Sequence, residues 1–212
     1  MILTVSKVVY ATWRVLKIMG FEIVFDIFSW HRSNYCYPSP KNVKQQVLRR
    51  NGFVRGTWVE TGTYLGDTTR FLSKNFAQVI SIEPDLVMFS RASKIFSQNK
   101  RVQLVFGTSE AKLPEVLLSI SGDVNFWLDG HYSGPGTFCS EVETPVMAEL
   151  TAIENRLSNF GNVCVLIDDI RLFQNKTKNP DYPDLELVIQ WAKSNLFDWH
   201  IEHDIFVAKR WA

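Results

Sequence analysis

The sequence predicts an α/β fold built on a doubly wound, mostly parallel sheet, with helices on both faces and one antiparallel hairpin strand at the C-terminal end. Three observations predict it. Short apolar runs of strand length alternate with longer stretches of helical period over residues 57–196. These runs are nearly continuous in apolar residues, which is typical of parallel strands covered on both faces. Two further strand-like runs close the chain, joined by a tight polar stretch around His203 and Asp204. Such an arrangement is Rossmann-like.

The strands and helices are expected in alternation. We expect strands at Thr57–Glu60, Gln78–Glu83, Val102–Phe106, Val124–Leu128 and Val163–Ile167. Helices are expected between and after them, at Leu65–Phe76, Leu86–Ser97, Lys112–Ser119, Glu141–Ser158 and Leu185–Leu196. A strand, a crossover helix and a second parallel strand form a right-handed unit, so this alternation gives a parallel sheet.

Composition limits the functional classes. At 212 residues and 24.5 kDa, the chain is expected to form one domain with a short appendage. Apolar residues make up 46% and charged residues 21%, which excludes a disordered chain. The formal net charge of +1 gives no electrostatic reason to expect a nucleic-acid partner, and we expect none. Cys36, Cys139 and Cys164 fit neither a disulfide framework nor a zinc site, so we expect a reducing, cytoplasmic compartment.

Residues 1–36 form a hydrophobic segment apart from the domain expected at residues 37–212. The segment is rich in aliphatic and aromatic residues, but charges interrupt it at Lys7, Arg14, Lys17, Glu22 and Asp26. No window of about 18 residues is free of charge, so we expect neither a transmembrane helix nor a cleavable signal. The three basic residues lie near one helical face. We therefore expect a helix that packs on the domain or on a second subunit of a homo-oligomer; peripheral membrane contact is the alternative.

Polar residues gather where the predicted strands end. In an open α/β sheet, ligands bind outside the carboxyl ends of the strands. All five ends carry polar or glycine residues, and four carry a carboxylate; the residues are Glu60 with Gly62 and Gly66, Glu83 with Pro84 and Asp85, Gly107 with Thr108 and Ser109, Asp129 with Gly130 and His131, and Asp168 with Asp169. Maintenance of the fold does not explain this pattern, so we interpret this edge of the sheet as a binding site.

The first two strand ends have the spacing of a nucleoside site. Gly62 and Gly66 allow the backbone to approach a ligand closely. Glu83 follows Gly62 by 21 residues, near the spacing at which an acid accepts hydrogen bonds from ribose hydroxyls. Neither G-x-x-x-x-G-K-[ST] nor a full G-x-G-x-x-G is present, so the sequence contains neither of these phosphate-binding motifs. A cofactor that has an adenosine but no phosphates fits better.

Over roughly residues 40–210, the chain resembles class I S-adenosylmethionine-dependent methyltransferases. The resemblance rests on "VETGTYLGDTT", "SIEPD", "FGTSE", "FWLDGHYSG" and "VLIDDIR". It implies that S-adenosylmethionine is bound by residues of these motifs, namely Glu60, Gly62, Thr63, Tyr64, Gly66, Asp67, Thr68, Glu83, Pro84, Thr108, Ser109 and Asp129. Tyr64 stands where many members have a glycine, which is similar to the small metal-dependent O-methyltransferases of the catechol and caffeoyl-CoA type. The "LDG" and "IDD" strand ends also resemble the macrocin O-methyltransferase group.

In those groups, acids at the ends of strands four and five bind a divalent cation. The resemblance carries this role onto Asp129, Asp168 and Asp169, and such oxygen ligands favour Mg²⁺. Coordination would lower the pKa of an acceptor hydroxyl and orient it. The alternative is that Asp168 caps the next helix and Asp169 is solvated.

His131 departs from the pattern of those groups. We expect it to be the general base of the catalytic centre beside Asp129, because the ordinary pKa of a histidine lies near neutrality. The alternative is a histidine that orients a neighbour. It opens a polar loop rich in Gly and Pro, "HYSGPGTFCSEVETP", which we interpret as a substrate lid.

Together these features predict an enzyme that methylates a hydroxyl of a small molecule, such as a sugar, polyol or phenol, with help from a divalent cation. Two rival interpretations remain open. One is a metal-independent methyltransferase in which the aspartates only hold loops. The other is a non-catalytic S-adenosylmethionine-binding or scaffold protein that docks through its N-terminal segment. Convergence of Asp129, Asp168 and Asp169 within about 5 Å would favour the cation site.

Overall fold

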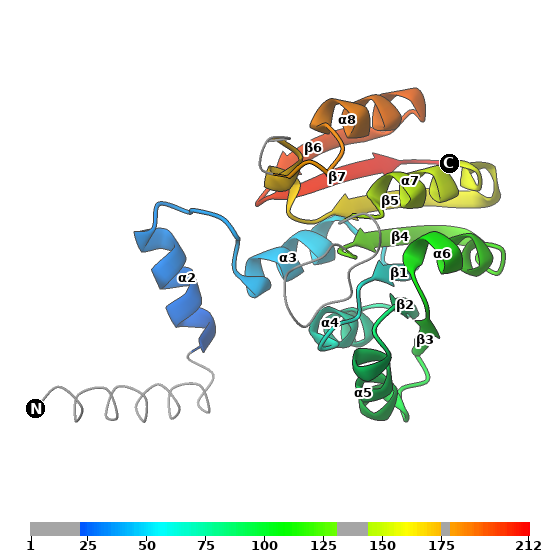
Figure 1. Cartoon of the computed structure of the whole chain (residues 1–212), viewed down its shortest axis with the longest axis horizontal. Coiled ribbons are helices and arrows are strands. Elements are labelled where there is room, and N and C mark those ends of the chain that lie inside the picture. Colours follow the sequence, from blue (N-terminus) through cyan, green and yellow to red (C-terminus); the bar gives the residue numbers. More distant parts are fainter. Residues whose placement is uncertain (1–21, 131–143, 175–178) are drawn as a thin grey trace, which may run out of the picture.

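A computed structural model of the chain describes residues 22–130, 144–174 and 179–212. Its centre is a seven-stranded mixed sheet with the order β3-β2-β1-β4-β5-β7-β6 (Figure 1). The first five strands run parallel, and β7 and β6 add an antiparallel hairpin beside β5. The predicted fold class is therefore confirmed. The strands are β1 (Thr57–Thr61), β2 (Val79–Glu83), β3 (Val102–Phe106), β4 (Gly122–Leu128), β5 (Phe160–Ile167), β6 (Asp198–Glu202) and β7 (Ile205–Arg210).

Helices cover both faces of this sheet. Side chains of α3 and α4 form one core layer with Trp58, Trp127 and Val207. Those of α6, α7 and α8 form a second layer on the other face. The helices are α2 (Glu22–Arg32), α3 (Lys41–Asn51), α4 (Asp67–Asn75), α5 (Leu86–Phe96), α6 (Ser109–Leu117), α7 (Val146–Glu154) and α8 (Leu185–Ser194), with 3₁₀ turns η1 (Leu157–Asn159) and η2 (Ile170–Gln174). This two-layered cover explains why the parallel strands are apolar on both faces.

The strand order reverses between β1 and β4. From β1 the chain continues through α4 to β2 on one side, while β4 continues to β5 on the other. The loops that follow β1 and β4 therefore diverge at the carboxyl edge, where ligands bind in sheets of this kind. Side chains alternate along β1, so Glu60 points to the α4 face and Thr61 to the α7 face.

Most predicted elements appear within a few residues of their expected bounds, but α3 was not predicted. Its sequence, KNVKQQVLRRN, is strongly polar, and only Val47, Leu48 and Asn51 are buried. Helix α6 begins at Ser109, earlier than expected, with Thr108 at its N-cap position. Helix α7 is shorter than the predicted Glu141–Ser158, and part of that range lies outside the described residues.

The described part of the N-terminal segment, residues 22–36, contains the helix α2. Figure 1 shows this helix beside the sheet domain, on the side to which α3 also projects. Its end contacts the β6–β7 turn, where the ring centroids of Trp30 and His203 lie 5.7 Å apart. Four large apolar side chains of α2 are exposed: Val24, Phe25, Ile27 and Phe28. Among the described residues, no helix is long and apolar enough to cross a membrane. A partner for this face, and a boundary between residues 36 and 37, stay predictions.

Candidate active site

The loop after β1 turns sharply against the end of β4. Gly62 has a φ of +87°, Tyr64 of +47° and Gly66 of +76°. A Cβ on Gly62 would lie 2.6 Å from the main-chain oxygen of Asp129, so a larger residue does not fit between these strand ends. At Gly66, the N-cap of α4, a Cβ would meet the Phe96 ring at 2.8 Å. The turn thus brings backbone into close contact at the point where the strand order reverses.

Glu83, at the end of β2, holds this turn from the neighbouring strand. Its Oε2 accepts a hydrogen bond of 2.7 Å from the Tyr64 amide, and its Oε1 accepts one of 2.9 Å from the Asp85 amide. Burial raises the pKa of Glu83, and these backbone hydrogen bonds oppose the rise. A carboxylate has about four acceptor sites, so Glu83 can still accept hydrogen bonds from ribose hydroxyls.

Glu60 lies buried beneath α4. Its Oε2 accepts hydrogen bonds from the hydroxyls of Thr69 at 2.5 Å and Ser81 at 2.6 Å, and the Ser81 hydroxyl lies 2.6 Å from that of Thr63. Burial raises the pKa of Glu60 to about 7, and the two hydroxyl donors oppose the rise. Its Oε1 and the Thr61 hydroxyl are buried with no hydrogen-bond partner in the described part of the chain. Unpaired buried polar atoms are costly, so both atoms suit donors on a ligand.

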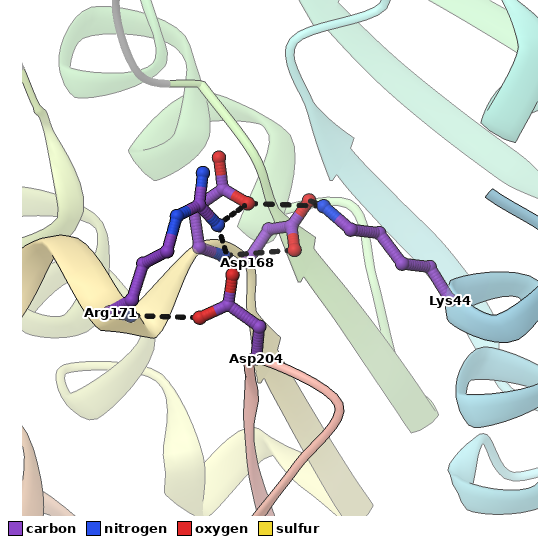
Figure 2. Close-up of polar contacts among 5 residues, drawn as sticks. Lys44, Asp168, Arg171 and Asp204 are labelled. Carbon is purple, nitrogen blue, oxygen red and sulfur yellow. Dashed lines mark hydrogen bonds and ion pairs between the residues drawn. The ribbon is translucent and has the colours of Figure 1, made fainter. Parts of the chain in front are cut away.

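Asp168 and Asp169, at the end of β5, meet Lys44 of α3. Figure 2 shows Lys44 reaching Asp168 from the opposite side to Arg171. The Lys44 Nζ lies 2.5 Å from Asp168 Oδ2 and 3.1 Å from Asp169 Oδ1. Burial lowers the pKa of Lys44, but attraction to Asp168, Asp169 and Asp129 outweighs it and raises the pKa above the ordinary value. Lys44 is therefore a fixed ammonium among the three predicted acids.

Arg171 ties Asp169 to the β6–β7 turn. Its Nη1 lies 2.7 Å from Asp169 Oδ1 and forms an ion pair with Asp204, which is 1% exposed. Its backbone amide also donates a hydrogen bond of 2.9 Å to Asp204 Oδ1. Burial raises the pKa of Asp204, and Arg171 opposes the rise. The Arg171 guanidinium therefore bridges two carboxylates, those of Asp169 and Asp204, and links η2 to the β6–β7 turn (Figure 2).

No protein-family model and no curated protein matches the sequence. Solved structures do match. A protein of Streptococcus mutans assigned as a methyltransferase, in complex with SAH, aligns with a TM-score of 0.51 and 16% identity, covering 82% of this chain and 98% of that one. A Staphylococcus aureus protein assigned as a caffeoyl-CoA O-methyltransferase aligns with a TM-score of 0.52 and 10% identity, covering 95% and 98%.

The chain has the fold of the class I S-adenosylmethionine-dependent methyltransferases. A Clostridium thermocellum protein assigned as an rRNA methylase shares the fold equally well, with a TM-score of 0.52, 14% identity and coverage of 79% and 94%. At such identities the likeness establishes the fold and leaves the acceptor open, because acceptors vary widely on one fold.

The methyltransferase fold places the other predicted cofactor residues around the same edge. Asp67 begins α4 and pairs with Lys41 at 2.6 Å, and Thr68 follows it in the first turn. Pro84 precedes Asp85, the N-cap of α5. Thr108 is the N-cap of α6, and Ser109 is its first, buried residue. Their contacts with a cofactor stay predictions, and His131 and most of the predicted lid lie outside the described residues.

Two of the three predicted metal ligands, Asp168 and Asp169, contact the Lys44 ammonium in this structure. No group of three or more His, Cys, Asp or Glu suited to a metal occurs in residues 22–130, 144–174 and 179–212. Lys44 instead contacts Asp168 and Asp169, so a divalent cation would have to displace its ammonium. The Mg²⁺ site at Asp129, Asp168 and Asp169 stays a prediction.

Two buried or half-buried residues of this edge, Lys44 and Glu149, were not predicted from the sequence. Lys44 lies 124 residues before Asp168, on the unpredicted helix α3. Glu149 on α7 is 1% exposed, and its Oε1 lies 3.5 Å from the position of a Cβ on Gly130. A single carboxylate within the apolar stretch VMAELTAI was the only local signal for Glu149. For Lys44 the sequence carries no such signal, since lysines on helices are mostly solvated.

Proposed function

We propose that the protein is an S-adenosylmethionine-dependent methyltransferase that methylates a hydroxyl of a small molecule. The observation that carries this proposal is the close approach of Gly62 to the Asp129 carbonyl oxygen at the reversal of strand order. This close approach places the turn after β1, where a ligand would bind, directly beside Asp129 at the end of β4. A methyl donor on the β1 and β2 side would then adjoin an acceptor on the β4 and β5 side.

The residues for the cofactor fit its chemical groups. Glu83, beside the turn, has lone pairs left for the ribose hydroxyls. The buried Glu60 Oε1 and the Thr61 hydroxyl lack hydrogen-bond partners among the described residues. Each can accept a hydrogen bond from the amino group of a bound cofactor, or from a water molecule that bridges to it. When bound, S-adenosylmethionine supplies a methyl group on a cationic sulfur.

The acceptor side is acidic. Glu83 and the turn after β1 would hold the cofactor, whose methyl group would pass to a lone pair of the acceptor oxygen as the C–S bond electrons stay on sulfur. The hydroxyl proton passes to a base, for which His131, next to Asp129 in the chain, stays the predicted candidate. Asp129, Asp168, Asp169 and Asp204 outnumber the cationic Lys44 and Arg171. This excess of carboxylates favours a neutral hydroxyl over a phosphodiester backbone.

Methyl transfer by these residues does not require the divalent cation that the sequence predicts at Asp129, Asp168 and Asp169. A panel of sugars, polyols and phenols with methyl-labelled S-adenosylmethionine tests the proposal, with a folded RNA as the contrasting acceptor. We expect S-adenosylmethionine and S-adenosylhomocysteine to bind the intact chain in calorimetry, and label to enter a small hydroxyl compound as a methyl ether.

The outcomes separate the rival functions. Binding of the cofactor without transfer to any acceptor favours the non-catalytic scaffold. Label in RNA overturns the choice of a small molecule but keeps the methyltransferase. Absence of cofactor binding overturns the proposal itself.

A further inference from the structure

We propose that the Lys44 ammonium occupies the position that a divalent cation would take between the acids of the strand ends. On this view Lys44 is a positioning residue that fixes Asp168 and Asp169 and places a permanent positive charge on the acceptor side of the cofactor edge. Its role in methyl transfer rests on the proposed function, whereas its exclusion of a metal does not.

The contacts of Lys44 carry the proposal. Its Nζ lies within 3.1 Å of two carboxylate oxygens on consecutive residues, Asp168 and Asp169. The side chains of Lys44, Asp168 and Asp169 are 18%, 4% and 14% exposed, so this group of charges is shielded from solvent. Surface ion pairs contribute little, but removing one member of a buried group leaves an uncompensated charge.

Helix α3 is anchored, so Lys44 is held rather than loosely extended. Val47 and Leu48 are buried in the core layer with Trp58. At the end of the helix, Asn51 donates a hydrogen bond of 2.7 Å to Glu202 of β6, and Arg50 forms an ion pair with the same carboxylate. The helix is therefore fixed to the sheet both by core packing and by polar contacts with Glu202. From this fixed helix the Lys44 side chain reaches Asp168 at the end of β5.

An ammonium and a divalent cation exclude each other here. Mg²⁺ requires oxygen ligands at about 2.0–2.1 Å in near-octahedral geometry. Lys44 already lies against Asp168 Oδ2 and Asp169 Oδ1, and Arg171 lies 2.7 Å from the same Asp169 oxygen. A metal at these oxygens would add positive charge directly beside two cations, which Coulomb repulsion disfavours.

The ammonium can also serve the acceptor. A lysine has three N–H donors, and two of those of Lys44 are directed at Asp168 and Asp169. The third is suited to an oxygen on which negative charge develops, the task that a metal performs in cation-assisted transfer.

Binding of Mn²⁺, followed by the electron paramagnetic resonance of the free ion without any cofactor, tests the proposal. The wild type should bind Mn²⁺ at least about tenfold more weakly than Lys44→Met does. Adding Asp168→Asn to Lys44→Met should abolish this binding. Lys41→Met is the matched control, because Lys41 lies on the same helix and pairs with the exposed Asp67; it should behave as the wild type.

Lys44→Arg retains a cation and should also exclude Mn²⁺, and a melting curve for each variant verifies folding. If Lys44→Met does not fold, wild type and Lys44→Arg still decide the proposal. Binding of Mn²⁺ by the wild type that Asp168→Asn abolishes overturns it, as does failure of a folded Lys44→Met to bind Mn²⁺. Because cofactor is absent throughout, a negative result here is separate from failure of methyl transfer.

Discussion

The Glu83 carboxylate accepts a hydrogen bond of 2.7 Å from the backbone amide of Tyr64, which lies 19 residues earlier at the end of a different strand. Tyr64 has a φ of +47°, a region that non-glycine residues seldom occupy. The bond therefore fixes the turn after β1 in an unusual conformation from the neighbouring strand. Glu83 therefore shapes the turn after β1, in addition to its predicted contact with ribose.

Replacing Glu83 with Ala should weaken S-adenosylmethionine binding by about tenfold or more, as expected for the loss of charge-assisted hydrogen bonds of about 1.5–3 kcal/mol. Calorimetric titration of the cofactor measures this effect. The turn amide of Tyr64 should also exchange faster with solvent, because its acceptor is lost.

Asp85→Ala is the matched control for this prediction. Asp85 lies in the same loop but accepts hydrogen bonds from Val87 and Met88 as the N-cap of α5. Its loss should cost about 1 kcal/mol of stability and leave the affinity for the cofactor unchanged. Equal losses of affinity in both variants would show that Glu83 acts only through the general stability of the loop.

Gly62→Ala should disrupt the turn. A Cβ there would lie 2.6 Å from the Asp129 carbonyl oxygen, and a φ of +87° is unfavourable for alanine. We expect a loss of more than about 2 kcal/mol of unfolding free energy together with loss of cofactor binding. Denaturant titration and calorimetry provide the measurements.

Gly122→Ala separates the effect of the positive φ from the effect of the short Cβ contact. Gly122 has a φ of +76°, but a Cβ there would have nothing within 4 Å. This variant should cost only the backbone strain, about 1–2 kcal/mol, and keep the affinity for the cofactor. If the two variants behave alike, the close approach of β1 to β4 has no role in binding.

The meeting of the polar strand-end residues at one edge of the sheet could be predicted from the sequence because its signals are local. Apolar runs mark β1 and β2, and Gly62 and Glu83 follow directly at the strand ends. Parallel strands place their carboxyl ends at one edge, so adjacent strand ends come together without any knowledge of distant contacts.

The cation among the aspartates could not be predicted in the same way. Lys44 meets Asp168 across 124 residues, and Arg171 meets Asp204 across 33. Nothing within α3 distinguishes Lys44 from the solvated Lys41 on the same helix. Three neighbouring acids were therefore interpreted as a metal site, since their countercharge lies on an element that the apolar pattern did not reveal.

The exposed face of α2 should contact a second molecule of the chain or a lipid surface. Double substitution of Phe25 and Phe28 with Ser removes two exposed aromatic side chains from this face, at 54% and 56% exposure. We expect a smaller apparent mass in light scattering if the partner is a second subunit, or loss of liposome flotation if it is a membrane. Val54→Ser, at another exposed apolar residue, is the control. If neither the apparent mass nor the liposome flotation changes, the prediction that this face has a partner is wrong.

Glu60 should make the stability of the protein depend on pH. Burial raises its pKa from 4.5 to about 7, so the folded state binds the proton more tightly than the unfolded state. Its contribution is fully present below about pH 4.5 and is lost as the pH rises through about 7. The difference amounts to at most roughly 3 kcal/mol. Glu60→Gln removes this titration, so the variant should gain stability relative to the wild type between pH 5 and 8.

The difference between the two proteins isolates Glu60 from two other carboxyls with raised pKa values, Asp168 and Asp204, because those groups titrate in both; Glu83 instead interacts with Glu60 and raises its pKa. Gln keeps an oxygen that can accept from Thr69 and Ser81, so the variant should remain folded. Urea titrations at a series of pH values provide the measurement, and Glu115→Gln controls for the loss of an exposed carboxyl that pairs with Lys112. If the stability difference between Glu60→Gln and the wild type stays constant across this range, Glu60 is ionised throughout, and its buried Oε1 has another source of compensation.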